Sequence, residues 1–269
     1  MKLDSLDLLA CPACHSPLAL HVKVDIREEV ENGSLHCAHC NKDYLIRQSI
    51  PHFIRPEELT GLNRRFARVY DWFSYVYRPA SAVLFAFMGG EKRYRREVLD
   101  RLDPKGGRVL EVSVGPGVNL PYLVGAPGVG EIYGLDISLG QLKRCQGFTR
   151  RRSWSVDLFL GNAEQLPFKD ASFESVFHIG GINFFNDKKK AIEEMIRVAR
   201  PGTKIIIVDE TEKGARAYRL TSPGFERMFD GKREVINVPV DLVPPTMVEV
   251  RVDYVWRGFF YCLEFRKPW

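Results

Sequence analysis

An acidic residue and a turn of small residues follow a short apolar run near the middle of the chain. Glu111 lies in the apolar run 109–112, and the turn 113–117 comes directly after it. A second apolar run ends on Asp136, about 20 residues beyond the turn, the spacing at which an acid typically holds a ribose. This pattern predicts a strand, a ligand-binding turn, a helix and a second strand, and a ligand that carries a nucleoside.

The turn does not fit a nicotinamide dinucleotide. The dinucleotide fingerprint needs glycine at three places of G-x-G-x-x-G, and these places hold Ser113, Gly115 and Val118. A pyrophosphate also favours the bare positive end of a helix, which the acid Glu111 at the start of the turn opposes. S-adenosylmethionine carries an amino group, a sulfonium and a ribose but no phosphate, so it suits these residues better. An ordinary turn without a ligand is the alternative.

Residues 109–119 resemble motif I of the class I S-adenosylmethionine-dependent methyltransferases, although many members have glycine at the position of Ser113. Residues 161–168 resemble the family segment G-D-A-x-x-L-P-F, whose first polar residue usually contacts the adenine. The resemblance covers residues 108–265. It implies a cofactor-binding set with the methionine moiety against Glu111, Gly115 and Gly117, the ribose against Asp136, the adenine against Asn162 and Ala163, and Ser113 and Ile137 beside them.

Strand-length apolar runs alternate with helical patterns over the same region. Residues 156–160, 172–179 and 204–210 are expected strands, and residues 187–200 have the apolar spacing of one helical face. Two antiparallel strands are expected at 248–252 and 259–265. The predicted fold is α/β, a Rossmann-like seven-stranded methyltransferase sheet flanked by helices. The predicted domain spans 62–269, with 62–105 as a helical lid segment.

Two C-x-x-C pairs near the N-terminus predict a metal site, because four thiolates on two tight turns form the tetrahedral shell of a structural zinc. The pairs are separated by 22 residues. Two disulfides are disfavoured in a cytoplasmic chain, and redox pairs do not explain the duplication. The expected domain is a small zinc ribbon over residues 1–55, and the expected ligands are Cys11, Cys14, Cys37 and Cys40.

This N-terminal segment resembles the small zinc-binding Trm112-type domain, through L-L-A-C-P-x-C-x-x-P-L and through residues 44–53. Members of that family serve as activating partners of methyltransferases, and some are fused to them. The resemblance implies an accessory module that has either RNA or a partner protein as a further binding target.

Residues 62–102 are rich in aromatic residues and resemble the first helices of ubiquinone/menaquinone-type methyltransferases, where such a segment covers the cofactor. Aromatic rings over a sulfonium gain cation–π attraction. Most of these rings are expected in the core, and Tyr70 and Tyr77 are the two chosen as cofactor contacts. Residues 56–61 are the expected linker.

Residues 178–185 follow the fourth expected strand, where the acceptor usually binds in this family. The segment has no N-P-P-Y-like tetrapeptide and no Pro-Cys, which argues against adenine amines, glutamine side chains and cytosine C5 as acceptors. The glycines at 180–181 allow close approach of a ligand, and the phenylalanines at 184–185 could wall an apolar one. His178 is the nearest candidate base, and a structural role is its alternative; Asp209 and Glu210 are further candidates.

The composition is that of a soluble enzyme, with 45% hydrophobic residues and a net charge of +5. No apolar run approaches the roughly 18 residues of a membrane span, and no signal-peptide core precedes the cysteines, so cytoplasmic residence is expected. The predicted activity is methyl transfer to a small, partly apolar acceptor, such as a quinone-, lipid- or polyketide-like oxygen or carbon. RNA is the alternative acceptor, favoured by the ribbon and by arginine clusters such as 150–152. A non-catalytic module that recruits a protein partner is the third hypothesis.

Overall fold

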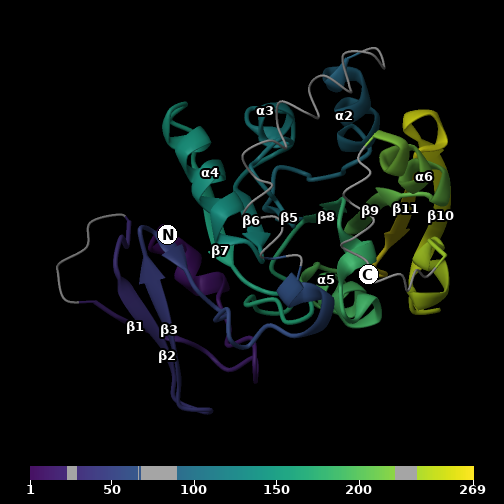
Figure 1. Ribbon diagram of the computed structural model, residues 1–269. Helices are drawn as coiled ribbons and strands as arrows, with labels where there is room; N and C mark the ends of the chain where they lie inside the picture. Colours follow the sequence, from purple (N-terminus) through teal and green to yellow (C-terminus); the bar gives the residue numbers. More distant parts are fainter. Residues whose placement is uncertain (23–28, 66, 68–89, 222–234) are drawn as a thin grey trace.

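A computed structural model of the chain describes residues 1–22, 29–65, 67, 90–221 and 235–269 (Figure 1). Its centre is a seven-stranded sheet in the order β10-β11-β9-β8-β5-β6-β7, in which β5 to β9 run parallel and β10 and β11 form an antiparallel pair. This confirms the predicted fold. The strands are β5 (Val109–Val112), β6 (Ile132–Asp136), β7 (Val156–Leu160), β8 (Ser175–Ile179), β9 (Lys204–Glu210), β10 (Val248–Val255) and β11 (Phe260–Arg266).

The strand order reverses beside β5, and this reversal positions the predicted site. The chain adds β6 and β7 on one side of β5, and then crosses back to place β8 and β9 on the other side. In doubly wound sheets, ligands bind outside the carboxyl ends of the strands at such a reversal. Glu111, Asp136 and His178 lie near the carboxyl ends of β5, β6 and β8, so the topology brings them to one edge.

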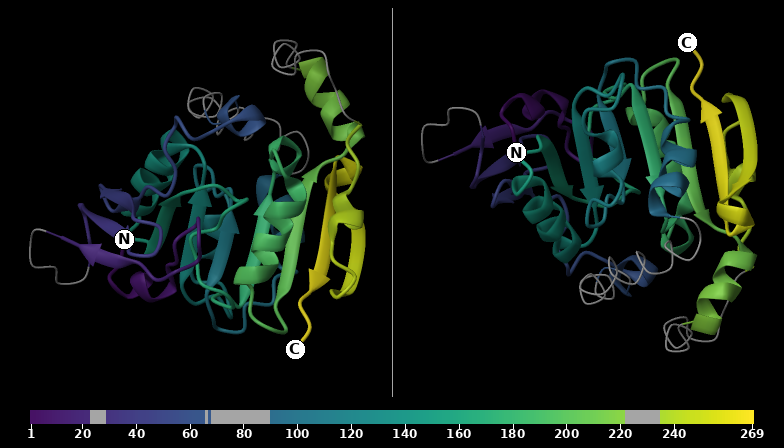
Figure 2. Two further views of the ribbon diagram at one scale, coloured as in Figure 1. Left: turned by 90° about the horizontal axis from the view of Figure 1, so that it is seen from below. Right: turned by 90° about the horizontal axis from the view of Figure 1, so that it is seen from above.

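Helices cover both faces of the sheet (Figure 2). The helices are α2 (Glu91–Leu99), α3 (Leu120–Leu123), α4 (Leu139–Arg150), α5 (Lys188–Val198) and α6 (Glu212–Thr221), with short 3-10 helices η1 (Asp4–Leu8), η2 (Ile182–Phe184), η4 (Pro239–Leu242) and η5 (Trp256–Gly258). Apolar residues of α2, α3 and α4 share one buried cluster with Phe177 and Val208, and those of α5 share a second cluster with Leu110 and Ile207. No helix among the described residues is long and apolar enough to cross a membrane.

The start of α5 shows how the sequence sets a boundary. Asp187, the first residue of the expected helix 187–200, is the N-cap residue, and its carboxylate accepts a hydrogen bond from the Lys190 amide at 2.9 Å. Such a cap satisfies one of the amides that a helix start leaves without a partner.

The N-terminal residues form a separate, four-stranded antiparallel sheet in the order β1-β2-β3-β4. This is the predicted ribbon. Its strands are β1 (Ala19–His21), β2 (Gly33–Cys37), β3 (Lys42–Arg47) and β4 (Ile50–Pro51).

The ribbon covers the β7 edge of the large sheet. The Phe53 amide donates to the Leu160 carbonyl at 2.8 Å, and His52 forms a parallel bridge to Leu160. A second contact joins Leu9 to Phe168 as an antiparallel bridge, next to the segment predicted to bind adenine. Covering an edge strand in this way satisfies backbone groups that would otherwise be open to pairing with another chain.

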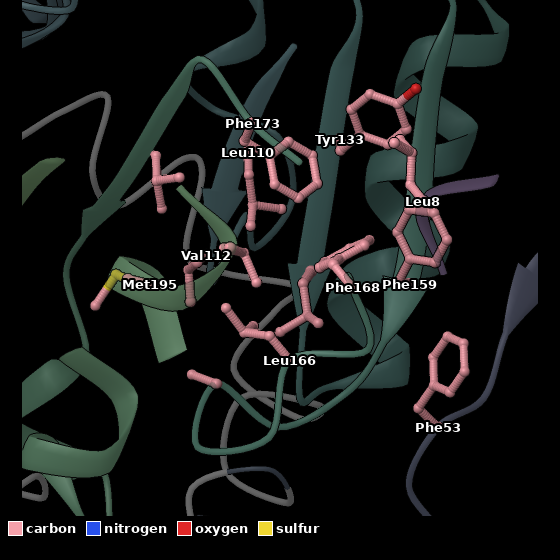
Figure 3. Close-up of a cluster of buried hydrophobic side chains, with 14 of the residues drawn as sticks. Leu8, Phe53, Leu110, Val112, Tyr133, Phe159, Leu166, Phe168, Phe173 and Met195 are labelled. Atoms are coloured by element: carbon pink, nitrogen blue, oxygen red, sulfur yellow. The ribbon is translucent and has the colours of Figure 1, made fainter. Parts of the chain in front are cut away.

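Apolar side chains fill the junction of ribbon and sheet (Figure 3). Leu8 and Phe53 of the ribbon belong to the same buried cluster as Phe159 and Phe168 of the large domain. The Phe168 ring lies 5.2 Å from the Phe159 ring and 4.9 Å from the Phe173 ring, both edge-to-face, a geometry that aromatic pairs prefer. The two domains therefore share one core.

We expect Phe168→Ala to lower the free energy of unfolding by about 3–5 kcal/mol, because it opens a cavity where the ring is fully buried. Tyr254→Ala, at a ring that is 66% exposed, is the matched control and should change this free energy by about 0.5 kcal/mol or less. Urea unfolding of both variants measures the difference. Equal losses in the two variants would contradict the shared core.

Candidate cofactor and metal sites

The turn after β5 has a left-handed backbone at three positions. The φ angles are 64° at Ser113, 53° at Gly115 and 77° at Gly117. Glycine adopts this conformation without strain, whereas another residue pays roughly 1–2 kcal/mol. The departure from the family pattern therefore falls where the backbone favours glycine, and serine is accommodated there with the turn intact. The Val114 amide donates to the Leu135 carbonyl at 3.0 Å and ties the turn to β6.

The two predicted glycines of the turn have different surroundings. A Cβ atom on Gly115 would meet no atom within 4 Å, so this side of the turn is open. A Cβ atom on Gly117 would lie 2.8 Å from the sulfur of Cys145 on α4 and 2.8 Å from a methyl group of Leu120 on α3. Gly115 therefore leaves room for a ligand, and Gly117 permits close packing of the turn against its helices.

Glu111 is a buried acid with an incomplete set of hydrogen bonds. Its Oε1 accepts from Asn119 Nδ2 at 2.5 Å, while its Oε2 and the Asn119 Oδ1 are buried without a partner among the described residues. Burial raises the pKa of Glu111 to about 8; Asn119 and Arg95 oppose this rise, and Asp136 adds to it. Two unsatisfied acceptor oxygens beside an open turn are a site for a hydrogen-bond donor, and a cationic donor suits the acid best.

Asp136 links the motif I turn to the start of α4. Its Oδ2 accepts from the Gly115 amide at 2.8 Å, and its Oδ1 accepts from the Ser138 amide at 2.8 Å. Ile137 lies half-buried between Asp136 and Ser138, which caps α4. The carboxylate is thus held beside the open side of the motif I turn, at the position that the spacing predicts for a ribose contact.

Asn162 and Ala163 follow the carboxyl end of β7. The Asn162 Oδ1 accepts from the Glu164 amide at 3.0 Å, which fixes the side chain of Asn162 within its own turn. Ala163 is buried. Helix α5 holds the backbone of residues 161–168. The Leu166 amide donates to Glu194 at 2.7 Å, and Arg197 donates to the Leu166 carbonyl at 2.9 Å.

His178 is buried and neutral. Its Nδ1 donates to the Val112 carbonyl at 3.0 Å, which leaves Nε2 as an acceptor without a partner among the described residues. Burial lowers the pKa of His178 to about 4. The Phe185 ring lies 5.3 Å from the imidazole in an edge arrangement. A fixed tautomer with an available nitrogen has the chemistry of a proton acceptor.

Asp209 and Glu210 end β9 beside the same loop. Asp209 is buried, and its Oδ2 accepts from the Asn183 amide at 2.9 Å. Burial raises the pKa of Asp209, and burial together with the neighbouring Asp209 raises the pKa of Glu210 to about 8. These bonds give Asp209 a role in holding the loop that follows β8.

Tyr70 and Tyr77, the aromatic contacts predicted from the sequence, lie outside the described residues. The other predicted cofactor residues meet along the carboxyl ends of β5, β6 and β7. Sequence reasoning missed Asn119, the partner of Glu111. An amide two positions after the last glycine of the turn was the available signal.

The residues present fit S-adenosylmethionine. Unsatisfied oxygens of Glu111 and Asn119 suit an ammonium group, the open side of Gly115 offers space, and Asp136 suits ribose hydroxyls. Among the described residues, the acids Glu111 and Asp136 flank the turn and disfavour a phosphate there. The chemistry of this donor set matches a cationic nucleoside.

The four predicted cysteines of the ribbon come together. The sulfur atoms lie within 4.8 Å of one another, and Cys14 and Cys37 are 3.5 Å apart. Thiolates at about 2.3 Å from a tetrahedral zinc are separated by roughly 3.8 Å, so the cluster fits zinc. The candidate ligands are Cys11, Cys14, Cys37 and Cys40.

Residues 110–207 match a family model described as a methyltransferase domain, and residues 2–49 match one described as a Trm112p-like protein. Both family resemblances are confirmed. The methyltransferase match contains the motif I turn, Asp136, Asn162 and His178, and the Trm112p-like match contains all four cysteines.

Curated relatives are similar over part of their length. A demethylmenaquinone methyltransferase of Renibacterium salmoninarum is 35% identical over 157 residues, which are 58% of this chain and 60% of the relative. The O-methyltransferase resE of Aspergillus sclerotiorum is 31% identical over 121 residues, which are 44% of this chain and 46% of the relative. The chain spans less than two thirds of the length of these relatives.

Solved structures show the same fold. A chain from a complex of the Haloferax volcanii Trm112 methyltransferase activator with a methyltransferase has a TM-score of 0.54 and 16% identity, covering 74% of this chain and 98% of that chain. The [4+2]-cyclase SpnF has a TM-score of 0.53 and 16% identity, covering 65% of this chain and 80% of that chain. At these identities the likeness concerns the fold alone.

We expect Cys37→Ser to remove zinc from the purified protein, because three thiolates and a hydroxyl bind zinc far more weakly than four thiolates. Cys262→Ser, at a buried cysteine outside the cluster, is the control and should keep about one zinc per chain. Elemental analysis of both variants measures the content. Equal zinc content in the two variants would rule out the cluster as the metal site.

We expect Glu111→Gln to flatten the pH dependence of stability in the protein without cofactor. The folded pKa of about 8 exceeds the ordinary value of 4.5, so the wild-type contribution is present at low pH and is lost as the pH rises through about 8. Melting temperatures between pH 5 and 9 measure this loss. Glu131→Gln, at an exposed acid, should follow the wild-type curve; a Glu111→Gln curve parallel to wild type would contradict the assignment.

Proposed function

We propose that this chain transfers a methyl group from S-adenosylmethionine to a small, partly apolar acceptor, a quinone-, lipid- or polyketide-like oxygen or carbon. One observation supports it above the others: buried acceptor oxygens of Glu111 and Asn119 lack donors beside the open turn at Gly115. This arrangement lies within the matched methyltransferase domain.

The residues of the motif I turn bind and orient the cofactor in this proposal. Glu111 and Asn119 accept from the amino group, Asp136 accepts from the ribose, and Asn162 faces the adenine. When bound, S-adenosylmethionine supplies a methyl group on a sulfonium, a good leaving group. The protein then acts mainly by alignment and by exclusion of water, so fixed side chains serve it well.

The loop that follows β8 offers an open backbone position and an aromatic ring beside His178. A Cβ atom on Gly180, directly after β8, would meet no atom within 4 Å, and the Phe185 ring packs on the imidazole. We assign His178 Nε2 as the group that accepts the proton of the acceptor's hydroxyl or acidic carbon. Relatives named for demethylmenaquinone and for phthiotriol/phenolphthiotriol dimycocerosates support an acceptor of this kind.

The described surface supports RNA as the acceptor less well than it supports a small molecule. Arg152 lies over the Phe148 ring at 4.0 Å and over the Trp154 ring at 5.4 Å, and Arg150 reaches the Ser49 hydroxyl of the ribbon at 3.5 Å. These arginines already have intramolecular partners. The hypothesis of a non-catalytic module that recruits a protein partner is also less well supported, because such a module would not need the unsatisfied hydrogen-bond acceptors of Glu111 and Asn119.

The ribbon over residues 1–55 acts within the same chain in this proposal, on a catalytic domain over 62–269. It contacts the adenine segment directly, since the Ala10 amide donates to the Pro167 carbonyl at 3.0 Å and the Lys169 amide donates to the Leu8 carbonyl at 2.8 Å. The zinc-held ribbon thereby fixes the backbone that follows Asn162. Its role is to support the cofactor site.

We expect wild-type protein to bind S-adenosylmethionine in calorimetry and Asp136→Ala to bind it at least about 10-fold more weakly, the loss for hydrogen bonds to a charged group. Asp241→Ala, at an exposed acid, is the control. His178→Gln should keep the affinity and lower kcat by about 100-fold or more in methyl transfer to a panel of hydroquinones and phenols.

Absence of binding by wild type, or undiminished binding by Asp136→Ala, would overturn the cofactor assignment. Methyl incorporation into bulk RNA, with association that weakens steeply as salt rises, would move the acceptor to nucleic acid. An unchanged kcat in His178→Gln would remove His178 from the reaction.

A further inference from the structure

One arginine of α2 is buried while its neighbours are exposed. Arg93 and Arg96 lie on the exposed face of the helix, and Arg95 is 3% exposed. A buried guanidinium costs several kcal/mol unless charges and hydrogen bonds compensate it. A cation is therefore placed inside the protein at this position, and its surroundings indicate what it serves.

Arg95 is held in a fixed orientation from two sides. Its Nε donates to Glu91 Oε1 at 3.3 Å, and its guanidinium carbon lies 5.5 Å from the centre of the Trp256 ring. Trp256 is fixed in turn, because its indole donates to the Tyr94 carbonyl at 2.7 Å. Trp256 and Arg257 have left-handed φ angles of 52° and 59°, so the loop after β10 accepts backbone strain where it supports Arg95.

Helix α2 lies near the motif I turn. α2 packs against α3, the short helix that follows the turn (Figure 1). The charge of Arg95 also lowers the pKa of Glu111, against the larger effect of burial. The packing of α2 against α3 therefore places the helix that carries Arg95 beside the motif I turn, and the charge of Arg95 acts on the buried acid Glu111.

The methionine end of the cofactor has the complementary chemistry. It is a zwitterion, with an ammonium and a carboxylate on the same carbon. The acceptor oxygens of Glu111 and Asn119 suit the ammonium and offer nothing to the carboxylate. A guanidinium is the side chain best matched to a carboxylate, because its planar donors can pair with both oxygens.

We infer that Arg95 is a further cofactor-binding residue, whose guanidinium recognises the carboxylate of the methionine moiety of S-adenosylmethionine. The inference rests on the proposed function. Glu91 and Trp256 then act as positioning residues, which hold the guanidinium toward the ligand. The competing interpretation is a structural ion pair between α2 and the acid of β5.

Removing the carboxylate from the ligand separates these interpretations. We would titrate S-adenosylhomocysteine, decarboxylated S-adenosylhomocysteine and 5′-methylthioadenosine into the full-length wild type and three variants. Arg95→Ala should weaken S-adenosylhomocysteine by about 10- to 100-fold, the range for charge-assisted hydrogen bonds. It should change the affinity of the other two ligands by less than about 3-fold, because they lack the carboxylate.

Two variants accompany this measurement. Arg96→Ala removes an exposed arginine from the same helix and should match wild type for all three ligands. Arg95→Lys keeps the charge without the planar fork and should lose part of the preference for the carboxylate. If Arg95→Ala fails to fold, Arg95→Lys and the wild-type preference for the carboxylate-bearing ligand carry the test.

A similar loss for all three ligands in Arg95→Ala would overturn the inference in favour of a structural ion pair. No preference of the wild type for the carboxylate-bearing ligand would overturn it as well. Failure of the wild type to bind any of the three ligands would instead overturn the proposed function, so the two failures are distinguishable.

Discussion

The burial of the Glu111 carboxyl is the constraint around which the cofactor edge is organised. Its oxygen Oε2 has no partner among the described residues, and burial raises its pKa to about 8, so the ligand-free protein carries a destabilised group. Asn119 and the charge of Arg95 compensate this cost only in part. Such an arrangement persists where a ligand supplies the missing interaction, and it exchanges stability for binding.

The same edge depends on contacts from a domain that contributes none of the predicted cofactor residues. The ribbon bonds to the backbone on both sides of residues 161–168, the predicted adenine segment, at Leu160 and at Lys169. Its own core is too small to be stable alone, so the metal and the aromatic cluster around Phe168 act together. The zinc ribbon and the predicted adenine segment are thereby parts of one packed unit.

The fold could be predicted from the sequence because each strand has a local signature. The apolar runs at 156–160 and 204–210 predicted β7 and β9 with their observed bounds, and the run that ends on Asp136 predicted the end of β6. The expected helix 187–200 begins at Asp187, the N-cap residue of α5. Arg95 could not be predicted, because Arg93 and Arg96 look the same in sequence and only packing against Trp256 distinguishes them. Ser113 departs from the family pattern, but its backbone keeps the conformation that glycine usually supplies.

A fold shared with SpnF, described as a [4+2]-cyclase, shows that the sheet alone does not define the reaction. Side chains at the carboxyl ends of the strands carry the chemistry, and one hydrogen bond links β5, which leads into the motif I turn, to His178 on β8. Val112, the last residue of β5, accepts the hydrogen bond that fixes the His178 ring, and the motif I turn starts at the next residue. A shift of the turn on cofactor binding would therefore move the His178 ring and its Nε2 atom. The strand that carries the motif I turn thus also fixes the ring of the proposed base.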